Sequence, residues 1–519
     1  SSRCEAKDVA LDSFGNVYVG GAFMDTLSFG GPDQVSDPFG DFFLVKHTPN
    51  GDYQWVATGG GSGVEEIIDI DIDPSGRIYV TGYMSSYDAD FGDGLRVSEG
   101  FLDILVLAFD PFGNFEWSRT FGSPGVDFGN AIVATPSGTV LVTGEFEDSV
   151  SFGLGAPLVA AGDTDAFVVE LDGATGNTIA RFQIGSDANG IGHDLECNAS
   201  GDYFLAGEFS TNAHFGGPNV ASAGMSDAFV AKYSLATHAL DWVTPVGGPH
   251  NDIAHGLTFD SIGNIYLTGS FRDSVSFGGT TITSAGHLDV LFVGLKSNGS
   301  PGGIQGFGGP FTDRGHDVDW SNGVLAVTGE FRGTAQFGPY ALTEAGFGDA
   351  FLLELSNFSA FECATQAGGP NFDAAYGVAV ADGGEIFLTG TYQTSASFDG
   401  VFPPMGTFLS SPFLAKYGGA TLAVPPAAFP AHHLRATPNP SRSGAMVSFE
   451  GLEAGASGTL EIFDVTGRLV YVNSEFLAGR AGGQWLGRDM AGNRLPSGIY
   501  LARVTTTTKT LNGRVVLID

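Results

Sequence analysis

The chain has 519 residues, and its 58 Asp and Glu outnumber its 22 Lys and Arg, which gives a formal net charge of −36. A body this acidic repels nucleic-acid phosphates and anionic membrane surfaces, and no apolar run reaches the length of a membrane span. The composition therefore argues against nucleic-acid partners and a membrane-embedded chain, and the length allows a large core and more than one domain.

A motif of the form Tyr-Val/Leu-Thr-Gly-x-Phe recurs seven times, in variant spellings, along the first four-fifths of the chain. Successive copies of its glycine are 60 to 63 residues apart. The seven glycines are Gly21, Gly82, Gly144, Gly207, Gly269, Gly329 and Gly390. A period this regular indicates repeated supersecondary units that bury their apolar faces only by stacking on one another.

The fifth repeat shows the expected content of one unit. Residues 257–260 alternate apolar and polar side chains, a turn cluster follows, and residues 265–269 and 289–293 are further strand candidates. In sibling repeats a fourth strand carries a tryptophan, at Trp55, Trp117 and Trp242. Four short antiparallel strands in each of seven repeats predict an all-β fold, with residues 1–424 forming a seven-bladed β-propeller. An open β-solenoid is the alternative, but its coils are shorter than these repeats.

An aspartate opens the expected third strand in six of the seven repeats. These residues are Asp41, Asp103, Asp165, Asp227, Asp289 and Asp349, and the seventh repeat has Ser411 instead. A ring of ligands is one interpretation. We favour a structural one, because a short carboxylate before a strand accepts hydrogen bonds from loop N–H groups. The same interpretation applies to Asp12, Asp73 and Asp260, which each precede a turn glycine.

Acidic side chains alternate with apolar ones along the expected first, innermost strands. The clearest run is Asp69, Asp71 and Asp73, and similar sets are Asp8 with Asp12, Asp194 with Glu196, and Asp317 with Asp319. Period two places each set on one side of its strand. If that side faces the axial channel, Asp69, Asp71 and Asp73 form a candidate Ca²⁺ site of hard oxygen ligands. Solvated acids in a wet tunnel are the alternative, and no other cofactor is expected.

Three histidines occupy equivalent positions in repeats four to six. They are His193, His255 and His316, and the other repeats carry Lys7, Ile68, Asn130 and Tyr376 there. Imidazole binds transition metals and titrates near neutrality, so a metal-binding or catalytic ring is chemically reasonable. However, equivalent positions on neighbouring blades are expected to lie far apart around a wide channel, which favours a structural role.

No catalytic constellation is visible in the sequence, which has no G-x-S-x-G, H-E-x-x-H or Walker motif. We therefore expect a protein that is not an enzyme and has no catalytic residues, and a propeller-based lyase or hydrolase is the least favoured hypothesis. Cys4, Cys197 and Cys363 are too few for a disulfide framework. They are expected to be buried thiols, although one bridge with a spare thiol is possible.

A different domain is expected after Tyr417, where the repeats stop. Residues 425–434 are rich in proline and predict a stiff linker. Residues 435–519 hold strand candidates whose spacing suits a small immunoglobulin-like β-sandwich, at 445–449, 460–464, 468–472, 499–504 and 514–518. From Leu434 onward nine Lys and Arg face seven Asp and Glu, so the tail has a net charge of +2 and the preceding body −38.

Three tail motifs, Pro438-Asn439-Pro440, Leu460 to Arg468 and Gly492 to Tyr500, resemble the C-terminal sorting domain of type IX secretion cargo. They equally resemble the immunoglobulin-like module of the flagellar hook-capping protein. The repeats resemble the bacterial SBBP β-propeller repeat in their D-x-x-G-N-x-Y-V-T-G and D-A-F-V-A-K segments. These resemblances imply export to the cell surface or beyond, without an established catalytic activity. The start at Ser1 fits a mature protein after signal-peptide removal, or a truncated one.

Two functions compete with the enzyme hypothesis. The first is a non-enzymatic structural protein of the cell surface or extracellular space, in which the basic tail docks on the acidic propeller of the next subunit and builds a head-to-tail filament. The second is an adhesion module that binds a glycan, a peptide or a surface protein through the loops of one propeller face. The connections between second and third strands are the longest in each repeat and are expected to form that face.

Overall fold

In a computed structural model of the protein, residues 4–393, 396–398 and 410–418 are described, together with most of the strands between 435 and 518. The chain divides into two compact units, residues 1–421 and 422–519. Throughout the described residues the regular structure is β-strand, so the predicted all-β class is confirmed, and none of their segments is a helix able to span a membrane. The predicted linker at 425–434 lies outside the described residues.

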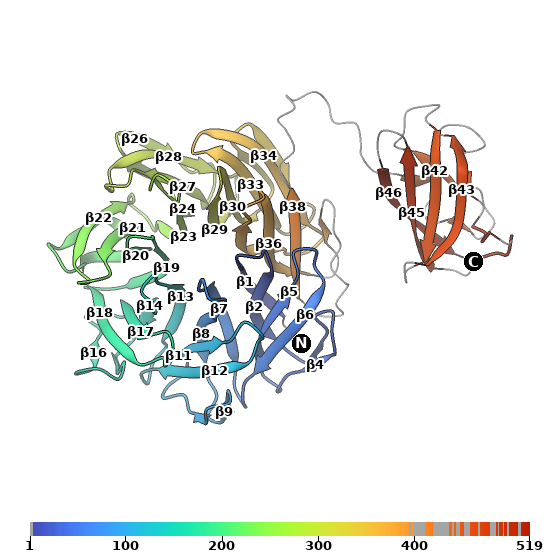
Figure 1. The fold of residues 1–519 in the computed structure, drawn as a ribbon. Coiled ribbons are helices and arrows are strands. Elements are labelled where there is room, and N and C mark those ends of the chain that lie inside the picture. Colours follow the sequence, from blue (N-terminus) through green and yellow to red (C-terminus); the bar gives the residue numbers. More distant parts are fainter. Residues whose placement is uncertain are drawn as a thin grey trace. The chain divides into compact units, whose positions relative to one another are not determined.

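Seven blades of antiparallel strands surround a common axis in the first unit, as Figure 1 shows, and the predicted seven-bladed propeller is confirmed. Blades one to three are β1 (Glu5–Leu11), β2 (Val17–Phe23), β5 (Asp41–His47) and β6 (Tyr53–Gly59); β7 (Glu65–Ile72), β8 (Ile78–Met84), β11 (Asp103–Phe109) and β12 (Phe115–Phe121); and β13 (Phe128–Ala134), β14 (Thr139–Phe146), β17 (Asp165–Asp172) and β18 (Thr178–Ser186).

The remaining blades repeat this order of strands. Blades four to six are β19 (Gly190–Cys197), β20 (Asp202–His214), β21 (Val220–Ser234) and β22 (Leu240–Val246); β23 (Ile253–Phe259), β24 (Ile265–Phe271), β27 (Asp289–Leu295) and β28 (Pro301–Phe307); and β29 (Arg314–Ser321), β30 (Val324–Phe331), β33 (Asp349–Asn357) and β34 (Ala360–Gly368). Blade seven shows β35 (Ala374–Val380), β36 (Glu385–Tyr392) and β38 (Ser411–Gly418). Its expected fourth strand, 421–424, lies outside the described residues.

Short hairpins occupy the connections between second and third strands in five blades. They are β3 (Thr26–Leu27) with β4 (Gln34–Val35), β9 (Ala89–Asp90) with β10 (Leu95–Arg96), β15 (Ser149–Val150) with β16 (Leu158–Val159), β25 (Ser274–Phe277) with β26 (Thr280–Thr283), and, in blade six, β31 (Thr334–Phe337) with β32 (Tyr340–Thr343). Blade five and blade six thus extend the pattern seen in blades one to three. Blade seven contributes β37 (Ser397–Phe398), and blade four extends β20 and β21 themselves.

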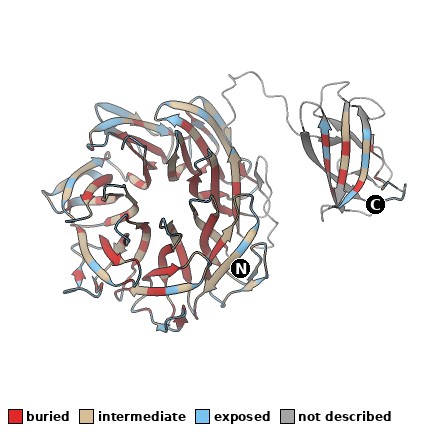
Figure 2. Ribbon diagram, viewed as in Figure 1, coloured by how far each residue is buried: buried red, intermediate tan, exposed pale blue. Residues whose placement is uncertain are grey.

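The strands of each blade bury both faces because a neighbouring blade packs on each side. Phe42 and Leu44 of β5 belong to an apolar cluster shared with blade two, whereas Phe43 and Val45 belong to one shared with blade seven. Within the described part of the propeller, one such cluster fills the space between each pair of adjacent blades. Figure 2 shows the buried residues concentrated on the inner strands.

The signature glycine of each repeat is explained by a β-bulge in the first strand. In all seven blades the register between first and second strands shifts by one residue, and the glycine pairs with the residue before the shift. A Cβ on Gly269 would stand 1.9 Å from the carbonyl oxygen of Ile253, and the matching distances at the other six glycines are 1.8–2.1 Å. Only a residue without a side chain fits opposite the bulge.

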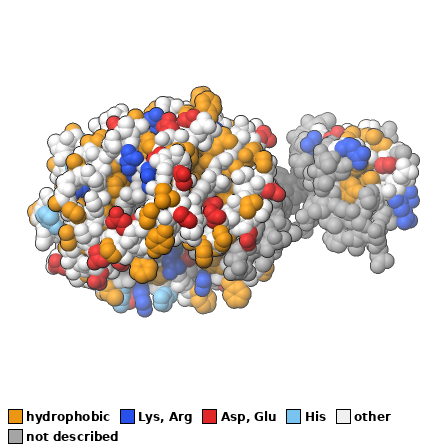
Figure 3. All heavy atoms as spheres, turned by 90° about the horizontal axis from the view of Figure 1, so that it is seen from below, with side chains coloured by type: hydrophobic (Ala, Val, Ile, Leu, Met, Phe, Trp, Pro, Cys, Tyr) orange, Lys and Arg blue, Asp and Glu red, His pale blue; other side chains and the backbone are white. Residues whose placement is uncertain are grey.

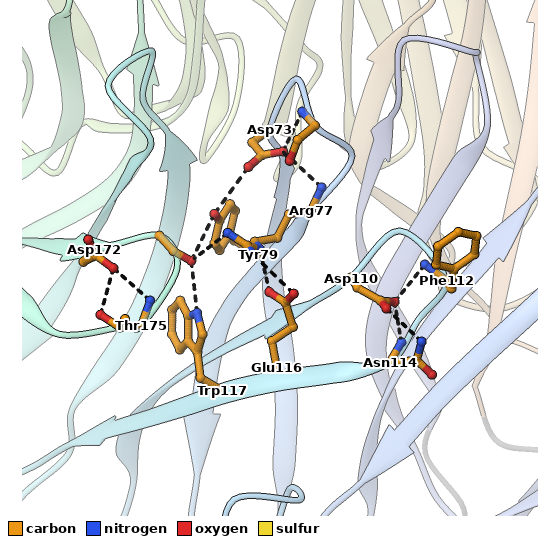
Figure 4. A network of polar contacts seen from close by, with 12 residues as sticks. Asp73, Arg77, Tyr79, Asp110, Phe112, Asn114, Glu116, Trp117, Asp172 and Thr175 are labelled. Carbon is orange, nitrogen blue, oxygen red and sulfur yellow. Dashed lines mark hydrogen bonds and ion pairs between the residues drawn. The ribbon is translucent and has the colours of Figure 1, made fainter.

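The predicted fourth-strand tryptophans join neighbouring blades. A Cβ on the turn glycines Gly113, Gly176 or Gly299 would approach the rings of Trp55, Trp117 and Trp242, respectively, to 2.5–2.7 Å. Figure 4 shows this contact between blades two and three. There Trp117 Nε1 and Tyr79 OH donate to the Gly173 carbonyl at 3.1 and 3.2 Å, and Arg77 pairs with Glu116.

Blades seven and one close the ring through side chains. Ala379 and Phe387 of blade seven pack in the cluster that contains Val9 and Phe43 of blade one. Lys416 Nζ donates to the Pro49 carbonyl at 3.2 Å across the same junction.

The second unit contains two sheets. One is β39 (Arg435–Thr437), β41 (Val447–Glu450) and β44 (Gln484–Trp485), and the other is β40 (Ser441–Arg442), β46 (Thr510–Ile518), β45 (Gly498–Thr506), β42 (Ser457–Asp464) and β43 (Leu469–Leu477). The buried Trp485 of the smaller sheet packs against Tyr471 and Tyr500 of the larger one, at ring-centroid distances of 6.2 and 5.9 Å. Two sheets joined by such an aromatic core form a small sandwich.

Candidate functional site: the axial channel and its rim

The extra residues of the seven bulges line one cavity on the ring axis, with a volume of about 290 Å³. They are Lys7, Ile68, Asn130, His193, His255, His316 and Tyr376. These are the equivalent positions that the sequence picks out. The bulge leaves each residue without a pairing partner on the second strand, and each side chain lines the channel instead.

The expectation that these positions lie far apart around a wide channel is wrong. The ring centroids of His193 and His255 are 5.4 Å apart, and His255 stacks on His316 at 5.8 Å with an interplanar angle of 7°. Tyr376 continues the row at 5.2 Å from His316, and the Lys7 ammonium lies 4.7 Å from the Tyr376 ring centroid. The bulges project these side chains inward, and five blades thus share one contact row.

Hydrogen bonds and neighbouring charges determine the protonation state of two groups in this row. His255 Nδ1 lies 3.0 Å from the Gly315 carbonyl, and because a carbonyl only accepts, Nδ1 carries the proton. Burial, followed by the two flanking imidazoles, holds the pKa of His255 well below its usual value. Lys7 contacts Glu5 at 2.7 Å and Glu66 at 3.4 Å, and these carboxylates raise its pKa although burial acts to lower it. The row therefore combines a neutral imidazole with a charged ammonium.

A layer of aspartates follows the bulge residues along the first strands. Each carboxylate accepts a hydrogen bond of 2.6–3.0 Å from a backbone N–H of the next blade. The pairs are Asp8 with Ile70, Asp69 with Ile132, Asp194 with Leu257, and Asp317 with Val378; one level deeper, Asp71 and Asp319 do the same for Ala134 and Val380. The first strand is the inner edge of its sheet, so these carboxylates satisfy N–H groups that no neighbouring strand reaches.

Seven carboxylates share the cavity of about 280 Å³ in this part of the channel. They are Asp8, Asp69, Asp71, Asp194, Glu196, Asp317 and Asp319. Burial, and then repulsion from neighbouring acids, raises the pKa of Asp8, Asp194 and Glu196 well above its usual value. Burial raises the pKa of Asp71 to about 6 and that of Asp317 to about 7. Such a layer favours protonated carboxyls or a bound cation.

The three predicted calcium ligands are not brought together. Asp69 and Asp71 line the acidic layer, but Asp73 lies in the hairpin turn, where its carboxylate accepts from Ser75 N at 2.8 Å and Arg77 N at 3.0 Å. The carboxylates of Asp12 and Asp260 likewise accept hydrogen bonds from backbone N–H groups of their own turns. Figure 4 shows the same interaction at Asp110. Among the described residues no group of three or more His, Cys, Asp or Glu has the arrangement of a metal site.

The periodic third-strand aspartates lie between blades and line neither channel cavity. Asp41, Asp103, Asp165, Asp227, Asp289 and Asp349 each accept an N–H from the residue four positions earlier, at 2.7–3.1 Å. Sequence reasoning missed a second acid at five of these junctions. The pairs are Asp41 with Glu65, Asp103 with Asp127, Asp227 with Asp252, Asp289 with Asp313, and Asp349 with Asp373. In the sequence, each second acid lies three residues before the extra residue of a bulge, and this repeated position could have identified it.

All three cysteines are free thiols, Cys4 buried and the other two half-buried. Burial raises the pKa of Cys4 to about 11 and that of Cys197 and Cys363 to about 12. Thiols with such values are poor nucleophiles at neutral pH.

Large apolar side chains are exposed at one repeated position, two residues before the third-strand aspartate. Phe39, Phe101, Met225 and Phe347 are 60%, 76%, 61% and 72% exposed, and we refer to them as the rim residues. Blades three and five have Asp163 and His287 there. In an antiparallel blade the third strand begins at the same end as the first, so the rim residues lie on the face where the histidine end of the channel opens. Hydrophobic, acidic and a few basic side chains are interspersed on the side of the propeller that Figure 3 shows.

Comparisons with known proteins agree with this architecture. Residues 436–518 match the family model described as a secretion system C-terminal sorting domain, and residues 241–270 match the β-propeller repeat model SBBP. An uncharacterized WD repeat-containing protein of Acanthamoeba polyphaga mimivirus is 27% identical over 164 residues, which is 27% of this chain but only 12% of that protein.

The solved structures that the chain resembles have low sequence identity and low TM-scores. The Pan2 WD40 domain of Neurospora crassa is 13% identical, with a TM-score of 0.35, over 74% of this chain and 85% of that one. PorZ of Porphyromonas gingivalis, a surface component of the type IX secretion system, is 11% identical with a TM-score of 0.17 over 99% of both chains. The chain is thus a β-propeller protein with SBBP repeats and a type IX secretion sorting domain, exported to the cell surface or the extracellular space.

Proposed function

We propose that this exported propeller is a non-enzymatic binding module of the cell surface, which contacts its partner with the face that carries the rim residues. The supporting observation is the exposure of these side chains in four blades, at 60–76% of their surface. Other phenylalanines of the repeat, such as Phe43 and Phe167, are buried between blades. Large apolar side chains that serve no core and gather on one face are typical of an interaction surface.

The roles of the channel residues support a binding rather than a catalytic protein. Asp69 and Asp71 hold backbone N–H groups of the next blade, and the Lys7 ammonium is paired with Glu5 and Glu66. A catalytic acid or base needs a partner group on a substrate rather than on its own scaffold. Structural bonds of this kind account for these titratable groups without a reaction.

The test measures retention of the labelled full chain on washed bacterial cells and on biofilm matrix. We expect the triple variant Phe39→Ser, Phe101→Ser and Phe347→Ser to lose at least about tenfold in retention, because each change removes exposed apolar contact area. The matched control is Phe14→Ser with Phe112→Ser, two exposed phenylalanines in hairpin turns at the opposite end of the blades.

Both variants are expected to melt at the wild-type temperature, since none of the five side chains is buried. Wild-type retention of the triple variant would contradict the proposal, as would an equal loss in the control.

A head-to-tail filament is a second candidate function, favoured by the division of charge. The tail from Leu434 onward carries a net +2, and the propeller before it −38. Unlike surfaces on one chain allow heterologous contacts, which give filaments when they do not close into a ring.

A further inference from the structure

A polar groove lies between blades three and four, where blade four departs from the other repeats. Its strands β20 and β21 continue past a register shift at Thr211, whose φ of 62° is unusual for a β-branched residue, into an extended hairpin. The end of β20 pairs with the end of β18, so that Gly185 faces His214. The extension thus places side chains of blade four against the outer strand of blade three.

The groove has a volume of about 330 Å³, and five of its eight lining residues carry an amide, a carboxylate or an imidazole. Its side chains are those of Gln183, Asp187, Asn212, His214 and Asn219, with Ala161, Gly185 and Ser186 completing the wall. Apart from the imidazole of His214 it has no aromatic side chain, and it has no aliphatic one larger than alanine. The amide, carboxylate and imidazole groups of the lining can pair with a ligand rich in hydrogen-bonding groups.

Part of the hydrogen-bonding capacity of this lining is used inside the protein. Asn212 Nδ2 donates to Asp187 Oδ2 at 3.0 Å, and Gln183 Nε2 donates to Asp165 Oδ2 at 2.9 Å. These bonds fix the positions of the two amides. The side chains of His214 and Asn219 make no hydrogen bond to any other described residue.

The neighbouring blades show that this is a particular property of blade four. Ser276 and Gln336 face Gly247 and Gly308 in blades five and six, as His214 faces Gly185. Ser276 Oγ bonds to Thr281 Oγ1 at 2.8 Å, and Gln336 Nε2 donates to the Gly338 carbonyl at 2.8 Å. In those blades the corresponding side chain is satisfied within its own hairpin, whereas the exposed ring of His214 has no hydrogen-bond partner among the described residues.

We infer that this groove binds a neutral saccharide, an assignment that goes beyond the proposed function because it adds a second site that contains none of the rim residues. A sugar hydroxyl both donates and accepts, so it can pair with the carboxylate of Asp187, the amides of Asn212 and Asn219, and the imidazole of His214. The Asp187 carboxylate disfavours an anionic ligand. The volume is near the lower end of the range of about 300–1,000 Å³ seen for ligand sites, which suits a short stretch of a glycan.

The test is isothermal titration of the full chain with four neutral tetrasaccharides, built of β-1,4-glucose, α-1,4-glucose, β-1,4-xylose and β-1,4-N-acetylglucosamine. We expect at least one to bind. The double variant His214→Ala with Asn219→Ala should raise its Kd at least about tenfold, since both side chains lie exposed in the groove and their removal leaves the fold intact. The matched control, Gln336→Ala in blade six, should bind as the wild type.

Absence of binding by all four sugars at millimolar concentration would overturn the assignment, and so would a double variant that binds as well as the wild type. The cell-retention assay separates this outcome from failure of the proposed function. If retention still depends on the rim residues while no sugar binds, the binding function holds and the saccharide assignment falls. If a sugar binds at the groove while the rim triple variant is retained like the wild type, the role of the rim falls instead.

Discussion

At the scale of single residues, the bulged strand beside each of the seven signature glycines leaves no room for a side chain. At Gly269 the nearest obstacle to a side chain is the Ile253 carbonyl oxygen, which belongs to the backbone of a bulged strand and cannot rotate away. The bulge in turn places His255 in the channel. One glycine thus permits both the tight approach of two strands and the inward position of a channel residue.

Gly269→Ala is therefore expected to lower the free energy of unfolding by about 2–3 kcal/mol, the upper part of the range for overpacking, because backbone must move to admit the methyl group. Urea denaturation monitored by tryptophan fluorescence measures this change. The control is Gly185→Ala, where the nearest atom would be Asp165 Oδ2 at an ordinary contact distance of 3.4 Å. A loss of equal size in the control would contradict the steric explanation.

The glycine positions could be predicted from spacing alone, but the bulges could not be assigned without the structure. Their trace in the sequence is a spacing of three instead of two between buried residues of the first strand, as in Ala6 and Val9 or Ile67 and Ile70. A strict period of two was assumed for these strands. That assumption grouped Asp73 with Asp69 and Asp71, whereas the expectation of a wide channel hid the contacts among His193, His255 and His316.

At the scale of elements, the junctions between blades are built around buried acid pairs. In all five of these pairs burial raises at least one pKa to about 6 or 7, as in Asp41 with Glu65 and Asp289 with Asp313. Asp252 and Asp373 reach about 7. Sequence patterns showed the first member of each pair but not the second, because the two acids come from different blades and meet only after the blades stack.

These pairs predict a protein that is more stable in mild acid than in mild base. In the unfolded chain the same carboxyls titrate near pH 4, so the folded state binds more protons between about pH 4 and 7. Their stabilisation is complete below about pH 4 and is lost as the pH rises through the folded values. The buried histidines His255 and His47, whose pKa values burial lowers, act in the opposite direction below about pH 6.5, but they are fewer than the acids of the five pairs. Calorimetry is expected to give a higher Tm at pH 5 than at pH 8.

Asp289→Asn tests the origin of this pH dependence. The amide oxygen can keep the bond from Ala285 N, and the NH₂ group replaces Oδ1, which has no hydrogen-bond partner among the described residues. The variant should melt above the wild type at pH 8 and show a smaller difference between pH 5 and pH 8. Asp163→Asn, at an exposed position, is the control and should leave the profile unchanged. An Asp289 variant with the wild-type profile would exclude the acid pairs as its cause.

At the scale of the whole molecule, the chain joins a propeller of net −38 to a tail of net +2. Acidic propellers repel one another over long distances, whereas a contact between a tail and the propeller of another copy depends only on charges close to it. Salt separates the two effects, since the Debye length falls from about 30 Å at 0.01 M to about 3 Å at 1 M. Sequence alone reveals this division of charge, but it does not show whether one copy recognises another.

If head-to-tail contacts form, association of the full chain should therefore peak near 0.1 M salt. Long-range repulsion opposes it at 0.01 M, and at 1 M the contact itself is screened. Sedimentation velocity across this range measures the distribution of species.

The variant Arg494→Glu with Arg503→Glu places negative charge on exposed tail positions and should abolish the peak. The control Arg272→Glu with Lys296→Glu makes the same change in net charge on exposed propeller positions and should preserve it. A protein that stays monomeric at every salt concentration would contradict the head-to-tail filament and leave the cell-surface binding module as the proposed function. An equal effect of both variants would show that the association depends on net charge and not on the tail.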